Sequence, residues 1–125
     1  MTKAATLPTR ATTTPETPVG REALRLRRLQ KGFGLTQAEL ARILETSPST
    51  LARRALTAAE LDRVEILEQL ARMATQIVPR EHLPRWLAEA KPPLDGAAPK
   101  ALLASESGRR RLETYLLRAL DGTAF

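Results

Sequence analysis

The stretch "TQAELARILETSPSTLARRA", residues 36–55, decides the fold of this 125-residue chain. It holds two helix starts in close succession. Thr36 and Glu39 have the T-x-x-E spacing of a capping box, in which each side chain accepts a hydrogen bond from the other residue's backbone N–H. Ser47 is a good N-cap, and Pro48 stands at the first helical position, where a missing N–H costs nothing. Two short capped helices joined by a turn of about three residues predict a helix-turn-helix.

The apolar pattern of this stretch agrees with the motif. Ala41 is the small residue expected where the two helices cross, and the turn at Glu45 or Thr46 must place one non-glycine residue at positive φ. The side chains expected to lie between the helices are Leu40, Leu44 and Leu51.

The second helix of the motif has a polar outer face. Hydroxyl and guanidinium groups contact DNA phosphates and guanine edges, so this face is a candidate DNA-binding surface. The alternative is a helix pair that serves only as a structural platform, with solvated arginines. The residues expected on this face are Ser47, Ser49, Thr50, Arg53 and Arg54.

Helix signals continue on both sides of the motif, and no sustained strand alternation interrupts them. Residues 21–31 predict a first helix closed by Gly32 and Gly34, and a second capping box, Thr57 with Glu60, begins a long helix that Pro79 ends. Further helices are expected over residues 80–91, 99–104 and 107–122, the last with Gly122 as its C-cap. The fold class is therefore all-α. The inner face of the last helix is expected to hold Leu112, Tyr115, Leu116, Ala119 and Leu120.

The composition limits the function. The chain carries a net charge of +6, and residues 21–56 hold eight basic and three acidic residues, so most of the excess lies around the helix-turn-helix. Such a localised excess suits a phosphate backbone, although solvated surfaces also produce it. Residues 1–20, rich in Thr and Pro, are expected to form a disordered arm without a role.

No catalytic constellation is visible in the sequence. There is one histidine, His82, no cysteine and no Gly-rich phosphate loop, so we expect no enzyme, no metal site, no cofactor and no small-molecule substrate. Trp86 is expected in the core. No apolar run reaches the roughly 20 residues of a membrane span and no signal peptide is evident, so a soluble cytoplasmic protein is expected.

The C-terminal third carries a family resemblance. Its marks are the Trp86-Leu87 pair, a Pro-containing linker, Pro99 opening a short helix, Gly108 before an Arg-rich stretch, and Gly122. On these features, and on "SPSTLARR" followed by "LTAAELDRVEIL", the chain resembles the Xre/MbcA/ParS antitoxins over about residues 24–125. After the arm expected at 1–20 from composition, the resemblance implies an Xre-like helix-turn-helix domain at 21–78 and a small helical toxin-binding domain at 79–125. Ala98, before Pro99, cannot cap, so packing must hold that helix start.

The resemblance further implies a type II toxin–antitoxin system. The partner would be a RES-domain toxin that consumes NAD or transfers ADP-ribose, and this chain would be its inhibitor and a homodimer, with operator DNA as a further partner. In this family the C-terminal end reaches toward the toxin's NAD pocket. The residues expected to bind the toxin are Arg109, Arg110, Arg111, Arg118, Gly122, Thr123, Ala124 and Phe125.

Phe125 at the end of the chain suits this role. Its ring can replace stacking in a dinucleotide cleft, and a terminal carboxylate can meet the groups that hold phosphate. The alternatives are a Phe125 that folds back onto its own domain and an arginine run that is only a solvated face. The competing function is a stand-alone DNA-binding regulator whose C-terminal helices dimerise it.

Overall fold

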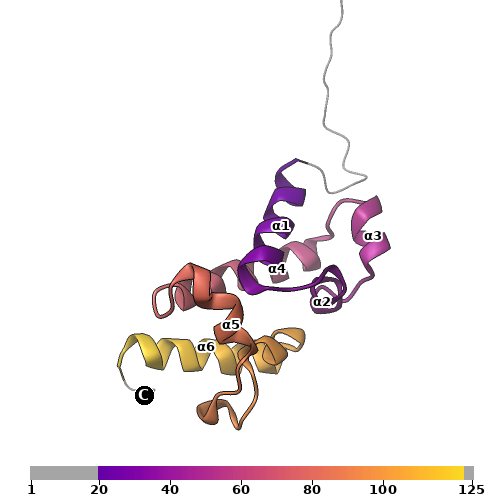
Figure 1. Cartoon of the computed structure of the whole chain (residues 1–125). Helices are drawn as coiled ribbons and strands as arrows, with labels where there is room; N and C mark the ends of the chain where they lie inside the picture. The colour runs from indigo at the N-terminus through magenta and orange to yellow at the C-terminus, as the bar shows by residue number, and fades with distance from the viewer. Residues whose placement is uncertain (1–19, 123–125) are drawn as a thin grey trace, which may run out of the picture.

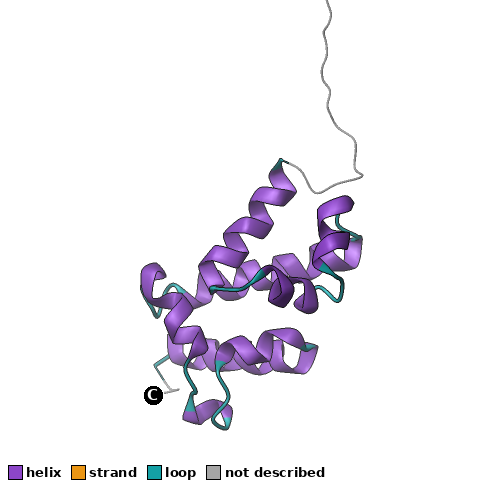
Figure 2. Ribbon diagram, turned by 45° about the vertical axis from the view of Figure 1, so that its right-hand side comes forward, coloured by secondary structure: helices purple, strands orange, loops and turns teal. Residues whose placement is uncertain are grey.

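A computed structural model describes residues 20–122 of the chain, and in this range it contains helices and no strand. Figure 1 shows the elements in order along the chain, and Figure 2 shows the same helices turned by 45°. The expected all-α fold is confirmed. The elements are α1 (Arg21–Phe33), α2 (Gln37–Ile43), α3 (Pro48–Arg53), α4 (Ala58–Ala74), η2 (Arg80–His82), α5 (Leu83–Ala88), η3 (Pro92–Leu94), η4 (Pro99–Ala104) and α6 (Glu106–Leu120).

The helix starts follow the predicted caps. Both capping boxes form, with the Thr36 hydroxyl 3.0 Å from the Glu39 N–H and the Thr57 hydroxyl 3.1 Å from the Glu60 N–H. Ser47 accepts from the Thr50 backbone at 3.1 Å and begins α3. Ala98 makes no capping bond, and the buried Pro99 holds the start of η4 by packing.

Several helix ends differ from the sequence-based expectation. Gly32 lies inside α1, which ends at Gly34 in the left-handed conformation. The helix α4 stops at Ala74, five residues before Pro79, because the Thr75 hydroxyl donates to the Ala71 and Arg72 carbonyls and the chain continues in turns.

The helix expected over residues 80–91 is also shorter. It is divided into η2 and α5 and ends at Ala88, after which Glu89 is extended. The last helix begins earlier than expected, because Ser105 caps it, and its C-cap is Asp121, with Gly122 following at φ 78°.

One hydrophobic core runs through the described chain, from Leu26 in α1 to Leu116 in α6. The helix α4 packs against both α1 and α6, and η4 packs against α5 and α6, so the C-terminal elements continue the core of the first four helices (Figure 1). Leu120, expected to face inward, is 38% exposed. The domain boundary between residues 78 and 79 stays a prediction.

Candidate functional site

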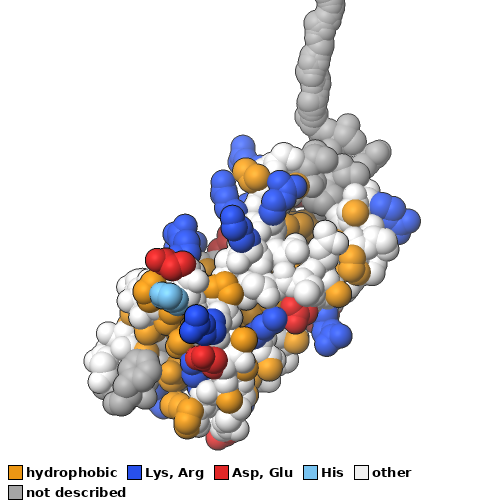
Figure 3. Space-filling model, viewed as in Figure 1, with side chains coloured by type: hydrophobic (Ala, Val, Ile, Leu, Met, Phe, Trp, Pro, Cys, Tyr) orange, Lys and Arg blue, Asp and Glu red, His pale blue; other side chains and the backbone are white. Residues whose placement is uncertain are grey.

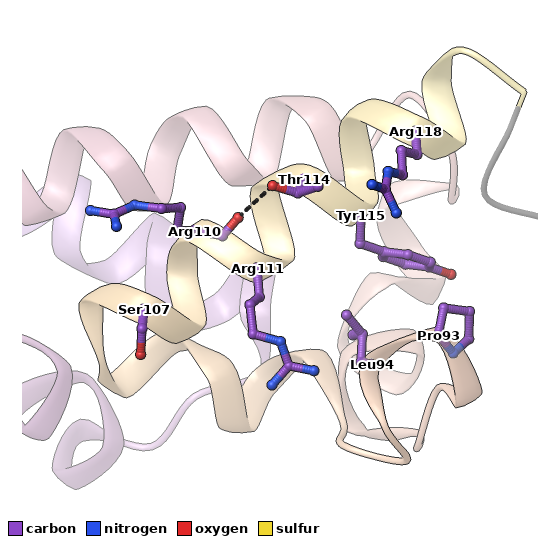
Figure 4. Close-up of a pocket in the computed structure, with 8 residues that line it drawn as sticks. All are labelled: Pro93, Leu94, Ser107, Arg110, Arg111, Thr114, Tyr115 and Arg118. Carbon is purple, nitrogen blue, oxygen red and sulfur yellow. Dashed lines mark hydrogen bonds between the residues drawn. The ribbon is translucent and has the colours of Figure 1, made fainter.

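One candidate site is a groove of about 550 Å³ along α6 (Figure 4). Three arginines expected to bind a partner, Arg110, Arg111 and Arg118, line it together. Three hydroxyls and the apolar Pro93 and Leu94 of the η3 turn complete the wall. We call this surface the α6 groove, and its lining residues are Pro93, Leu94, Ser107, Arg110, Arg111, Thr114, Tyr115 and Arg118.

The spacing of the polar residues along α6 explains why their side chains lie on the same face of the helix. Ser107, Arg111, Thr114 and Arg118 recur every three or four residues, which places them on one helical face. This spacing was visible in the sequence and would have added Ser107 and Thr114 to the expected site. Pro93 and Leu94 come from a different element, and nothing in the local sequence places them beside α6.

Two arginines of the groove make exposed ion pairs. Arg111 reaches Asp95 at 3.0 Å and Arg110 reaches Glu106 at 3.0 Å, while the Arg111 side chain is 47% exposed and Asp95 is 89% exposed. Such exposed pairs contribute little to stability, so an incoming carboxylate can replace either acid at small cost. The groove is thus suited to binding an acidic group.

The groove has one aromatic lining residue, Tyr115, which packs on a second aromatic ring. Tyr115 is buried and stacks on Trp86, with ring centroids 6.2 Å apart and an angle of 17° between the planes. Burial raises the pKa of the Tyr115 hydroxyl. On the Trp86 ring lies the Lys91 ammonium, 4.7 Å from its centroid. Trp86 packs against the core, as expected from the sequence.

Arg109 lies apart from the other three arginines. It is only 7% exposed, and its guanidinium donates to the Leu103 carbonyl at 2.8 Å. Desolvation, with a smaller contribution from Arg63, lowers the pKa of Arg109. The sequence led us to expect Arg109 on the surface, in contact with a toxin. Its burial does not fit that role, because the helical register of α6 turns the Arg109 side chain toward η4. Arg109 therefore fastens α6 to η4.

The tail expected to contact a partner is only partly described. Gly122 is the last residue that the structure describes, and its positive φ of 78° turns the chain away from the helical path. The expected contacts of Thr123, Ala124 and Phe125 lie outside the described residues.

The helix-turn-helix forms as predicted. Leu40, Ala41, Leu44 and Leu51 are all buried, and Glu45 takes the positive φ, 61°, that the turn requires. Its carboxylate is 3.1 Å from Arg63 of α4, but the side chain is 65% exposed, so this pair offsets little of the backbone strain.

We predict that Glu45→Asn stabilises the chain by about 0.5 kcal/mol, because Asn enters the left-handed region more easily than Glu. Glu45→Ala, which removes the same ion pair and keeps the strain, should not stabilise it. Thermal unfolding followed by circular dichroism compares the three proteins. Equal melting temperatures for the Asn and Ala variants would contradict the claim that the positive φ at residue 45 destabilises the chain.

Arg54 does not share the outer face with the other expected DNA-binding residues. Its guanidinium donates to both carboxylate oxygens of Glu60 at 2.8 Å, and Glu60 is 5% exposed. The Ser47 hydroxyl lies 3.2 Å from the Ser49 hydroxyl and donates to the Thr50 hydroxyl at 2.8 Å. Among the described residues of α3, Arg53 is the exposed cation. The Arg54–Glu60 ion pair was not predicted from the sequence, because Glu60 was already assigned to the capping box with Thr57.

The Arg54–Glu60 pair predicts a pH dependence of stability. The hydrogen bond from Arg54, with help from the Thr57 backbone, lowers the pKa of Glu60 in the folded state. The stabilisation is therefore present above the unfolded pKa of about 4.3 and is lost as the pH falls through the folded value. We expect the melting temperature of Glu60→Gln to fall less between pH 7 and pH 3 than that of the wild type. Parallel curves would contradict this account.

Two kinds of site are not found in the part of the chain from residue 20 to 122. It has no group of three or more histidine, cysteine, aspartate or glutamate side chains placed to hold a metal ion. No helix in this range is long and apolar enough to cross a membrane.

Comparison with known proteins adds to the geometry. Residues 21–74 match the model of the antitoxin Xre-like helix-turn-helix domain. Among solved structures, the chain is similar to a chain of the M. tuberculosis MbcT-MbcA toxin-antitoxin complex, with 20% sequence identity and a TM-score of 0.61, over 83% of this chain and 97% of that one. At this identity the likeness concerns the fold. No curated protein matches the chain.

The domain match covers α1 to α4, including both capping boxes and the strained turn at Glu45. The fold match covers 83% of the chain and so extends beyond the domain match. The expected resemblance to the Xre/MbcA/ParS antitoxins is therefore borne out for residues 21–74, which match the antitoxin Xre-like helix-turn-helix domain, and the chain shares its fold with a chain of the MbcT-MbcA complex.

Proposed function

We propose that this chain is the antitoxin of a type II toxin–antitoxin system and neutralises a RES-domain toxin that consumes NAD or transfers ADP-ribose. The observation that carries the proposal is the antitoxin domain match at residues 21–74, followed directly by helices that present the α6 groove. The solved relative belongs to a toxin–antitoxin complex, which supports a toxin partner. In this proposal the chain acts as a binding protein and not as an enzyme.

The α6 groove is the proposed toxin-contacting surface. Arg110, Arg111 and Arg118 supply charge for acidic groups of the toxin, and Pro93 and Leu94 supply apolar contact beside them. Interfaces combine an apolar centre with charged groups at the rim, and arginine is enriched there because its planar fork binds carboxylates in pairs. Arg109, buried on the side of α6 that faces η4, positions the helix and does not contact the toxin in this proposal.

The segment after α6 is proposed to block the toxin's NAD site. Its sequence, Gly122-Thr-Ala-Phe125, offers one aromatic ring after a residue that turns the chain away from the helix. An aromatic ring can occupy a cleft that otherwise stacks a nucleotide base. The segment and the groove would then have separate roles, inhibition and affinity.

Two variants test this division. Deletion of residues 122–125 should leave toxin binding within about tenfold of wild type, since the groove is intact, and should restore NAD consumption by the complex. Phe125→Ala isolates the contribution of the ring. If the deleted chain still inhibits the toxin fully, the segment does not block the site, and inhibition must come from the groove.

Autoregulatory DNA binding and a homodimer are the remaining parts of the proposal. The outer residues of α3 available for DNA are Ser49, Thr50 and Arg53, since Arg54 is held by Glu60. This short set would give limited base readout. The homodimer is checked by light scattering of the purified chain.

A further inference from the structure

The helix α1 carries a strip of cations that the helix-turn-helix does not explain. Its buried face consists of Leu26, Leu29 and Phe33. On the opposite side of the helix the exposed residues are predominantly basic, and Figure 3 shows Lys and Arg side chains gathered over α1. We call these four residues the α1 strip: Arg21, Arg27, Arg28 and Lys31.

The α1 strip is not neutralised within the described chain. None of its four residues forms a salt bridge there, whereas Arg25, at the side of the helix, is paired with Glu68 at 2.8 Å. The one acidic residue of α1, Glu22, lies half-buried on the core side and accepts from the Leu56 backbone at 3.4 Å. Arg28 makes a small contribution to lowering the pKa of Glu68, but that carboxylate is already hydrogen-bonded to Arg25.

The geometry of the strip fits a line of phosphates. Ten residues of α-helix separate Arg21 from Lys31, which spreads the four charges over about 15 Å. Successive phosphates of one DNA strand advance about 3.4 Å along the axis, so a strip of this length follows a backbone over several nucleotides. The exposed face of α1 that carries the strip holds a single large apolar residue, Leu24, whereas a helix that lies on a membrane carries a broad apolar face.

We propose that the α1 strip binds the phosphate backbone of double-stranded DNA and supplies most of the DNA affinity of this chain. The strip belongs to the matched helix-turn-helix domain, which favours DNA over other acidic partners. Among the described residues, α3 retains only Arg53 and α2 only Arg42 as exposed cations, so most of the exposed positive charge of the matched domain lies on α1. The inference rests on the DNA-binding part of the proposed function and is independent of its toxin-binding part.

The proposal predicts weakly sequence-dependent binding with a steep salt dependence. Each phosphate contact contributes about 0.9 to the slope of log K against log salt concentration. The triple variant Arg27→Gln/Arg28→Gln/Lys31→Gln should therefore lower the magnitude of the slope by about 2 to 3 and weaken binding on the order of a hundredfold at 0.1 M salt. Glutamine keeps the helix propensity of the replaced residues.

The probe is a fluorescein-labelled mixed-sequence duplex of about 30 base pairs, titrated at several salt concentrations with the full chain and followed by anisotropy. The matched control, Arg72→Gln/Arg80→Gln/Arg85→Gln, removes the same charge from exposed arginines on α4, η2 and α5. It should bind nearly as the wild type does. Circular dichroism confirms that both variants remain folded.

Three results would overturn the proposal. The first is that the wild type does not bind the duplex, and the second is that both variants lose affinity for DNA equally. The third is that the strip variant loses binding to vesicles of anionic phospholipid while its DNA binding is unchanged. The strip variant should still bind the toxin, so failure of this inference is distinguishable from failure of the antitoxin proposal.

Discussion

The variant Gly108→Ala is expected to destabilise the chain by about 2–3 kcal/mol, although the same change inside a helix normally stabilises it by up to about 1 kcal/mol. A Cβ on Gly108 would lie 2.3 Å from the Leu102 carbonyl oxygen and 2.8 Å from the Ser105 hydroxyl. The first contact is with backbone, which cannot rotate away, and the second disturbs the hydroxyl that caps α6 at 3.0 Å. The junction between η4 and α6 must therefore shift.

Gly32→Ala is the matched control for this prediction. Gly32 lies inside α1, and a Cβ there would meet nothing within 4 Å. This change should raise the melting temperature slightly, while Gly108→Ala should lower it by about 10 °C or more. Thermal unfolding by circular dichroism gives both values. If Gly108→Ala is neutral or stabilising, η4 and α6 do not pack as described.

The second large effect is expected in the α6 groove. Arg110→Glu/Arg111→Glu reverses two of its three exposed charges and should weaken toxin binding by roughly a hundredfold or more, because repulsion replaces attraction for acidic groups. The cost in folding should be small, since both arginines pair only with exposed acids, Glu106 and Asp95. Calorimetry of the purified variant with the toxin measures the affinity.

Arg80→Glu/Arg85→Glu reverses two charges outside the groove and controls for net charge. Its toxin affinity should remain within a few-fold of wild type at physiological salt, where distant charges are screened. A similar loss in both double variants would show that the toxin responds to overall charge, and the α6 groove would no longer be the proposed contact surface.

Local sequence signals predicted the helix starts better than the helix ends. Thr36, Ser47 and Thr57 each bond to the backbone of the residue three positions later, so the whole cap lies within one turn of sequence. The helix ends depend on side-chain hydrogen bonds that have no fixed sequence spacing. The Thr75 hydroxyl, which closes α4, competes for carbonyls in a way that apolar periodicity does not reveal.

The site was predicted where it lies on one helix and missed where it depends on packing. Arg110, Arg111 and Arg118 share α6 and could be grouped from the sequence, whereas Pro93 and Leu94 reach the groove only through the folding of η3 against α6. Arg109 and Arg54 were placed on the surface because arginines usually are exposed. Their partners, the Leu103 carbonyl and the Glu60 carboxylate, become neighbours only in the folded chain.

The most direct test of the antitoxin proposal is to capture this chain by an N-terminal tag from its own host and to identify its partner by mass spectrometry. The wild type should retain a RES-domain protein, and the Arg110→Glu/Arg111→Glu variant should lose it. NAD consumption by that protein should be suppressed when the wild-type chain is added back. If no RES-domain protein is retained, or if the retained protein is unaffected by the wild-type chain, the antitoxin proposal is contradicted.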